Sequence, residues 1–257
     1  MKICVLIKQV PDKDTSYKIN DDDLSINTSD ISFVTNESDN YALEEALQLK
    51  EKYNGEVVVY TFGPESSKQV LKDALSKGAD RAVHISNEDY FELDILSISK
   101  IFCNVIEKES FDLILSGLQS DDSGNGQLGI LLAEMLKFTH ASLVMETDFD
   151  GSGDIKVKRE LENGWFQWSK LQLPASITIQ SGINTPRYAS LMGIMSMKKK
   201  PLDELSKEDI GLDIVSQAEI KKLCFPPKDK KTIFIEGDVE NMTNEIVNVL
   251  KNEIKII

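Results

Sequence analysis

Residues 113–137, LILSGLQSDDSGNGQLGILLAEMLK, combine a short apolar strand, a loop of small and polar residues and an amphipathic helix. A glycine-bearing loop that leads into a helix directs unpaired backbone N–H groups, and the positive end of the helix dipole, toward one point where an anion can bind. The glycines let the backbone approach a ligand closely and adopt positive φ. The stretch therefore predicts a phosphate cradle, and a solvated surface loop is the alternative.

Strand-like and helix-like segments alternate on the N-terminal side of this loop. The expected strands are 2–9, 56–62, 82–85 and 113–116, and the expected helices are 36–52, 67–77 and 94–107. Short apolar strands rich in β-branched residues are typical of sheets that are buried on both faces. The alternation predicts a parallel, doubly wound sheet with right-handed crossovers, in which ligands bind beyond the carboxyl ends of the strands.

Three other segments are expected at the same edge of this sheet: Gln9-Val10, Phe62-Gly63 and the helix start Asn36 to Asp39. They offer backbone and amide partners and an apolar wall, which an adenine or a ribose requires. Asn36 and Asp39 are also spaced like a helix capping pair, so ordinary capping and turn chemistry is the alternative for these residues.

The pattern changes after residue 137. Two alternating segments, 155–161 and 165–173, flank Glu162-Asn163-Gly164, which predicts a β-hairpin. A strand at 176–179 is expected to end the sheet. Farther on, Ser206 and Asp209 predict a short capped helix turn, and 244–254 predict a small amphipathic helix or arm.

Residues 181–202, SGINTPRYASLMGIMSMKKKPL, are apolar and cationic without a steady period, which predicts a long loop. Soft, apolar side chains outside the expected core suit an adaptable protein-binding surface, with Lys198 to Lys200 as a cationic rim. The alternative is that these side chains pack on their own domain.

Composition excludes several classes. A net charge of −14 over 257 residues argues against a general nucleic-acid or anionic-membrane surface, and the apolar runs are too short to cross a bilayer. Three distant cysteines and two histidines suggest buried thiols and neither a disulfide framework nor a zinc site. Because no secretory signal follows Met1, we expect a soluble, cytoplasmic protein.

Residues 124–129, GNGQLG, match GxGxxG, and Glu146 lies about 20 residues farther on, as in dinucleotide-binding folds. That fingerprint belongs in the tight turn after the first strand, whereas here it follows several strands and is separated from Ser116 by seven residues. We therefore regard the match as incidental and do not expect an NAD-dependent dehydrogenase.

Taken together, these motifs resemble the β subunit of electron-transfer flavoproteins. The matching pieces, in order, are ICVLIKQVPD, ESDNYALEEALQLKE, KGADRAVHI, GLQSDDSGNGQ, VKRELENG, LPASITIQSGINTPRYASLMGIM at 173–195 and KKKPLDEL. They cover essentially the whole chain.

The resemblance implies an α/β fold: a doubly wound, mostly parallel sheet of the adenine nucleotide alpha-hydrolase-like type, with a β-hairpin. It implies a nucleotide-binding domain at 1–224 that includes a recognition loop at 182–200. A C-terminal arm at 225–257 would pack on the partner subunit. The chain would be an electron carrier subunit and no enzyme by itself.

Its partners would be an α subunit holding most of the redox FAD contacts, flavin-dependent dehydrogenases as electron donors and a quinone oxidoreductase as acceptor. This chain would hold a structural AMP, with the phosphate on the amides of 124–127. Carried over by position, the cofactor-binding residues are Leu6, Asn36, Glu37, Ser38, Asp39, Phe62, Gly117, Gln119, Ser120, Asp121, Ser123, Gly124, Asn125, Gly126 and Gln127. The partner-binding residues are Pro186, Arg187, Tyr188, Leu191, Met192 and Ile194, with Leu191 as the anchor that enters a dehydrogenase.

Two alternatives stay open. The first is a flavin-bifurcating relative with a second FAD in place of AMP, although the loop SDDSGNGQLG lacks the DGDTAQVGP-like run of such relatives. The second is a nucleotide-binding regulatory module without a redox role. We assign no catalytic residue and no metal ligand in this chain.

Overall fold

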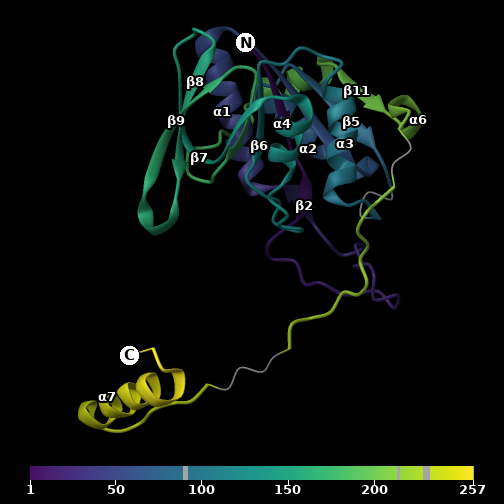
Figure 1. Cartoon of the computed structure of the whole chain (residues 1–257). Helices are drawn as coiled ribbons and strands as arrows, with labels where there is room; N and C mark the ends of the chain where they lie inside the picture. Colours follow the sequence, from purple (N-terminus) through teal and green to yellow (C-terminus); the bar gives the residue numbers. More distant parts are fainter. Residues whose placement is uncertain (89–91, 213–214, 228–231, 257) are drawn as a thin grey trace. The chain divides into compact units, whose positions relative to one another are not determined.

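The computed structural model describes residues 1–88, 92–212, 215–227 and 232–256. Within these residues nine strands form one sheet (Figure 1). In sheet order they are β11 (Leu202–Leu205), β5 (Arg81–Ser86), β4 (Glu56–Gly63), β1 (Lys2–Leu6), β6 (Leu113–Gly117), β10 (Ala175–Ile179), β7 (Thr139–Phe149), β8 (Asp154–Glu160) and β9 (Phe166–Gln172). A second, two-stranded sheet pairs β2 (Gln9–Pro11) with β3 (Phe33–Thr35).

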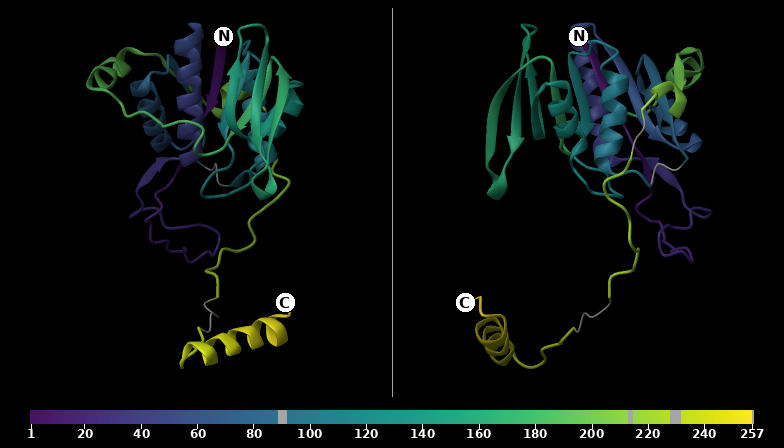
Figure 2. Two further views of the ribbon diagram at one scale, coloured as in Figure 1. Left: turned by 90° about the vertical axis from the view of Figure 1, so that its left-hand side faces the viewer. Right: turned by 45° about the vertical axis from the view of Figure 1, so that its right-hand side comes forward.

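The sheet is parallel from β11 through β7, and β8 and β9 add an antiparallel ribbon at one edge (Figure 2). In its centre Cys4 of β1 lies opposite Val58 of β4 and Ile114 of β6. The predicted doubly wound, mostly parallel α/β fold is thus confirmed.

Successive side chains of a strand point to opposite faces of the sheet. Because both faces of the central strands are apolar, helices cover each of them. Ile3 and Val5 pack in one core cluster with residues of α1 and α2, while Cys4 and Leu6 pack in a second cluster with α3 and α4. The helices in chain order are α1 (Glu37–Tyr53), η1 (Glu65–Ser67), α2 (Lys68–Lys77), α3 (Ile95–Ile106), α4 (Leu128–Leu136), η3 (Glu162–Gly164), α5 (Leu191–Ser196), η4 (Met197–Lys199), α6 (Lys207–Ile210), α7 (Val239–Asn248) and η5 (Val249–Ile254).

Local signals placed several helix ends and turns correctly. Asn54 ends α1 with a positive φ of 51°, and Gly78 ends α2 with a φ of 136°. Ser206 and Asp209 form a capping box at the start of α6. The predicted hairpin is present as β8 and β9, joined by η3.

The sheet edge and the cationic segment differ from the prediction. β10 does not end the sheet but lies between β6 and β7, and the strands β7 and β11 were not predicted. Residues 181–202 do not form a continuous loop, because α5 and η4 interrupt it. Cys4 is buried as expected, whereas Cys224 is exposed.

The described chain divides into two compact units, Met1–Lys222 and Leu223–Ile257. The first contains every buried hydrophobic residue of the described chain. The second contains α7, which Asp238 caps, and η5, and neither helix has a buried residue.

Candidate functional site

The carboxyl edge of the parallel strands gathers four segments from distant parts of the sequence. These are the residues after β1, the residues after β4, the start of α1 and the loop 118–127 after β6. Gln9 connects the first two, because its amide nitrogen donates to Ser66 O at 3.0 Å and its amide oxygen accepts from Ser66 Oγ at 3.0 Å. The predicted convergence at this edge is thus present.

Asp39 joins β1 and β6 at this edge. Its Oδ2 accepts from Lys8 N at 2.8 Å and its Oδ1 accepts from Gly117 N at 2.9 Å. The side chain is 6% exposed, and burial raises the pKa of Asp39 to about 7 although the two backbone N–H donors act to lower it. Asp39 is therefore a clamp between strand ends and not the capping residue that its spacing suggested.

Asn36 and Ser38 tie the start of α1 to the loop after β6. Asn36 Nδ2 donates to Gln119 O at 2.9 Å, and Asn36 Oδ1 accepts from Asp121 N at 2.9 Å. Ser38 Oγ donates to Gln119 O at 2.8 Å. Because no side chain caps the N-terminus of α1, the expectation of simple helix capping at Asn36 is wrong.

Gly117 makes this close contact possible. A Cβ at Gly117 would fall on Ser38 Oγ and Asp39 Oδ1 and would lie 2.8 Å from Asp39 N. Any side chain here would push the start of α1 away from the end of β6.

The loop then leads to the N-terminus of α4. Gly124 and Gly126 have positive φ of 61° and 62°, and α4 begins at Leu128 without a side-chain cap. The first N–H groups of a helix have no partner inside the helix, and they attract anions. The geometry fits the phosphate cradle that the sequence predicts.

Lys8 pairs with one acidic side chain of this loop, Asp122. Lys8 Nζ lies 2.7 Å from Asp122 Oδ1 and 3.5 Å from Ser123 Oγ. Burial acts to raise the pKa of Asp122, but the Lys8 ammonium, together with hydrogen bonds from Ser120 and Ser123, holds that pKa below its usual range. Sequence reasoning did not single out Lys8, which lies two residues beyond the end of β1, or Asp122 within the glycine-bearing loop.

Two predicted apolar contacts lie in the core at this edge. Leu6 is 3% exposed at the end of β1, and Phe62 is 8% exposed in β4. The Phe62 ring packs edge to face on Phe102, with 6.4 Å between the ring centroids. Both residues belong to one buried core cluster.

The predicted residues therefore divide into two groups. The buried residues are Leu6, Asn36, Ser38, Asp39, Phe62 and Gly117. The exposed residues are Gln119, Asp121, Ser123, Gly124, Asn125 and Gln127, and the two of intermediate exposure are Ser120 and Gly126. Glu37 points away, toward Lys13 on the surface. Glu146, the acid of the GxGxxG match, is exposed on β7 and pairs with Lys158 at 3.5 Å, as expected if that match is incidental.

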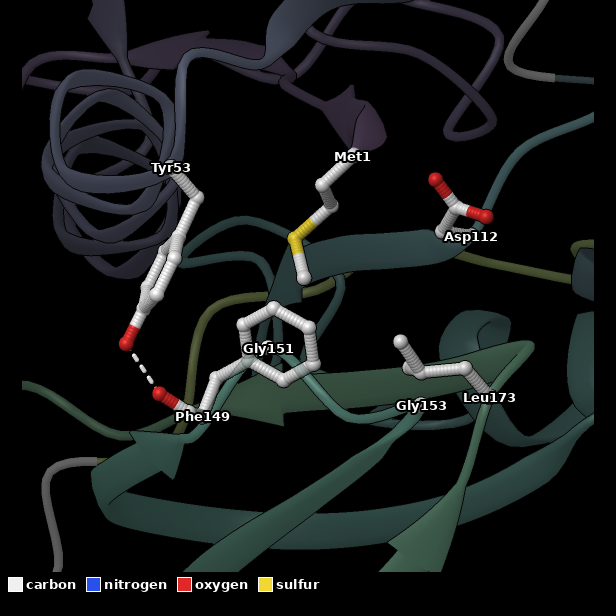
Figure 3. A pocket seen from close by; sticks show the side chains of 7 residues that line it. All are labelled: Met1, Tyr53, Asp112, Phe149, Gly151, Gly153 and Leu173. Carbon is white, nitrogen blue, oxygen red and sulfur yellow. Dashed lines mark hydrogen bonds between the residues drawn. The ribbon is translucent and has the colours of Figure 1, made fainter.

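A pocket of about 360 Å³ lies at the opposite, amino end of the sheet, where Met1 and Asp112 precede β1 and β6 (Figure 3). Its polar groups already have partners: Tyr53 donates to Phe149 O, and Asp112 Oδ2 accepts from Lys2 N at 2.7 Å. We assign no ligand to this pocket.

Glu65, His84 and Glu204 also converge, but Lys68 bridges the two carboxylates at 2.7 and 2.9 Å. A lysine ammonium thus already supplies the positive charge that a metal would bring, and we assign no metal here.

A second candidate surface surrounds α5. Tyr188 is 95% exposed, Leu191 83% and Met192 81%, so the predicted alternative of packing on their own domain is wrong for these side chains. Within the predicted cationic rim, Lys198 and Lys199 are exposed, whereas Lys200 points inward and donates to Leu75 O and Ala79 O. Single exposed apolar residues are common, but a cluster of them marks an interaction surface.

The sheet, its helices on both faces and the glycine-bearing loop at its carboxyl edge define a doubly wound α/β protein with a site suited to an anionic ligand. None of the helices in the described ranges is long and apolar enough to cross a membrane.

Comparison with known proteins identifies the family within this class of α/β proteins. Residues 23–210 match the family model described as electron transfer flavoprotein domain. Proteins named electron transfer flavoprotein subunit beta from Methylophilus methylotrophus and Bacillus subtilis are 35% and 36% identical to the chain. The alignments cover 99% and 100% of both sequences, respectively. The mitochondrial protein of the same name from Arabidopsis thaliana is 32% identical over 100% of both sequences. The chain therefore belongs to the electron transfer flavoprotein family, and its full-length relatives are beta subunits.

Proposed function

We propose that this chain is the β subunit of a heterodimeric electron transfer flavoprotein. The main support for this proposal is family membership, because relatives named as beta subunits align with the full length of this chain. The redox FAD would be held mainly by the α subunit. The complex would accept electrons from flavin-dependent dehydrogenases and pass them to a quinone-linked acceptor, and this chain alone would catalyse no reaction.

The carboxyl edge would bind a structural AMP. The first amides of α4 and the glycine-bearing loop would hold its phosphate, and Lys8 would offset the nearby carboxylates. Leu6 and Phe62, at the ends of β1 and β4, would provide an apolar wall for the adenine. The short distances between Gly117, Ser38 and Asp39 support the proposal, because they fix the two segments that would frame the nucleotide.

The exposed residues around α5 would meet the dehydrogenase, with Leu191 as the anchor. A protruding apolar side chain that fills a partner's pocket is a common interface hot spot. Leu191 and Met192 are suited to this role, since both are more than four-fifths exposed in the chain. The C-terminal unit, Leu223–Ile257, would pack on the α subunit.

Cofactor content tests this proposal. The purified αβ complex is denatured, and the released nucleotides are separated by chromatography and quantified against the protein. We expect one FAD and one AMP for each heterodimer. Two FADs without AMP would instead indicate the bifurcating alternative. A stable, colourless monomer that recruits no flavin-bearing partner would favour the regulatory module.

A further inference from the structure

The exposed α5 lies between two anchors, each made by a basic side chain, in the segment 182–200, which we call the recognition segment. Its N-terminal anchor is Arg187. Arg187 Nε and Nη2 donate to Glu44 of α1 at 2.8 and 3.0 Å, and Arg187 Nη2 also donates to Glu51 at 3.2 Å. A guanidinium that contacts two carboxylates has its orientation fixed as well as its position.

The Glu44 carboxylate is buried, which makes this anchor stronger than a surface pair. Glu44 is 5% exposed, and it also accepts from Gln48 Nε2 at 2.9 Å and from the Arg187 backbone N–H at 3.2 Å. Burial acts to raise the pKa of Glu44, but the bonds from Arg187 outweigh it and lower that pKa. Arg187 is thus occupied within the chain, although the sequence placed it among the partner-binding residues.

Lys200 is the C-terminal anchor. Its Nζ donates to Leu75 O at 2.8 Å and to Ala79 O at 2.6 Å. These carbonyls lie in the last turn of α2 and just after it, where the helix leaves acceptors unpaired and carries partial negative charge. The neighbouring Lys199 is exposed and provides a natural comparison.

Between the anchors, α5 rests directly on α2 through Gly193. A Cβ at Gly193 would fall on Ser76 O, so only glycine permits this approach. At the base of the segment Asn184 Nδ2 donates to Tyr41 O at 3.1 Å and to Glu45 Oε2 at 3.0 Å.

We propose that Arg187, Gly193 and Lys200 are positioning residues that hold the recognition segment in its docking conformation before a dehydrogenase binds. This inference rests on the proposed docking role of α5. The segment combines highly exposed apolar side chains with a backbone fixed to α1 and α2. A surface that is already ordered loses less conformational freedom on binding, so it binds more tightly for the same contacts.

The test uses the complete αβ complex with its cofactors. Turnover is measured with a flavin-dependent dehydrogenase from the same organism, chosen because it reduces the wild-type complex, while the concentration of the complex is varied. Four variants are compared: Lys200→Met, Arg187→Lys, Leu191→Ala and, as the matched control, Lys199→Met. Amide hydrogen exchange of residues 188–199 and the flavin absorption spectrum are recorded for each.

We expect Lys200→Met and Arg187→Lys to raise the KM for the complex by about tenfold, because the freed segment must be ordered on binding. The kcat and the flavin spectrum should stay near the wild-type values, and amides of 188–199 should exchange faster. Lys199→Met removes an exposed charge of the rim without freeing the segment, so it should leave exchange unchanged and raise KM much less than Lys200→Met does.

Two results separate the inference from the function on which it rests. If Leu191→Ala leaves KM unchanged, the docking role of α5 is wrong. If Leu191→Ala raises KM while Lys200→Met and Arg187→Lys behave like Lys199→Met, the docking role stands and the positioning inference is overturned. Gly193→Ala provides an independent check, and it should also raise KM without a change in the flavin spectrum.

Discussion

Asp39 shows how one residue can connect distant segments. Its carboxylate accepts backbone N–H groups that follow β1 and end β6, so it stabilises the edge where we place the nucleotide. The same burial that makes the clamp rigid disfavours the charged form, and the pKa of Asp39 rises to about 7. The pKa of an aspartate carboxyl in an unfolded chain lies near 4.

This difference predicts a pH-dependent stability. Between the two pKa values the folded state binds more protons than the unfolded state, so the contribution of Asp39 to stability falls as the pH rises. Relative to Asp39→Asn, the wild-type chain should lose about 2 kcal/mol of unfolding free energy between pH 5 and pH 7. Urea unfolding of both proteins at the two pH values measures this change.

Asp22→Asn is the control for this experiment. Asp22 is exposed, and bonds from Leu24 N and the Ser25 side chain hold its pKa below its usual value. Its contribution is therefore complete above pH 5, and the difference from wild type should be constant between pH 5 and pH 7. A constant difference for Asp39→Asn as well would contradict the assignment of a raised pKa.

Among the elements, α3 has an N-terminus with two roles. Asp94 Oδ1 accepts from Ser97 N at 2.7 Å and caps the helix. Its Oδ2 accepts from Gln217 N at 2.6 Å and from Ala218 N at 3.1 Å, while Asp94 N donates to Ser216 Oγ at 2.9 Å. One carboxylate thus starts a helix and holds a segment more than 100 residues away.

Asp94→Asn should separate these roles. Asparagine caps helices about as well as aspartate, so α3 should keep its helicity and stability should change by less than about 1 kcal/mol. The new NH₂ group cannot accept from Gln217 and Ala218, and their amides should exchange about tenfold faster or more. Hydrogen exchange read by NMR or mass spectrometry measures this.

The N-cap of α7 offers the matched control. Asp238 accepts from Asn241 N at 2.8 Å and from Asn241 Nδ2 at 3.0 Å, both within its own helix. Asp238→Asn should therefore leave exchange at 217 and 218 unchanged. Wild-type exchange rates at these positions in Asp94→Asn would show that Oδ2 does not hold the segment.

For the whole molecule, the two units differ in how they are stabilised. Met1–Lys222 contains two core clusters of fully buried side chains. In the described part of Leu223–Ile257 no apolar residue is buried and several stay exposed, with Phe234 at 83% and Val239 at 76%. An amphipathic element that buries nothing in its own chain is expected to gain stability from a partner.

Truncation after Lys222 should therefore affect assembly more than folding. The truncated chain should unfold within about 3 °C of the full chain, because its core is intact. In size-exclusion chromatography it should bind the α subunit more weakly than the full chain does. A loss of more than about 10 °C would show that the C-terminal unit contributes to the core of the first.

Pattern reasoning succeeded where the signal is local. The period of the apolar residues located the helices α1 and α3, and Asn163-Gly164 located the hairpin. It failed for β11, since the four residues Leu202–Leu205 carry too short an alternation to recognise, and they become a strand only by pairing with β5. α5 has only six residues, and its position against α2 depends on contacts made by Gly193.

The sequence by itself determined the doubly wound class and the glycine-bearing loop before α4, because apolar period and turn chemistry are properties of neighbouring residues. It left the exposure of Leu191 open, and the tertiary structure decided it. Only the tertiary structure decided the roles of Asp39, Arg187 and Lys200. Asp39 was expected to cap a helix, Arg187 to bind a partner and Lys200 to belong to a cationic rim. Each side chain instead binds groups that are far away along the chain. Such partners are chosen by the packing of the sheet and its helices, which no local pattern encodes.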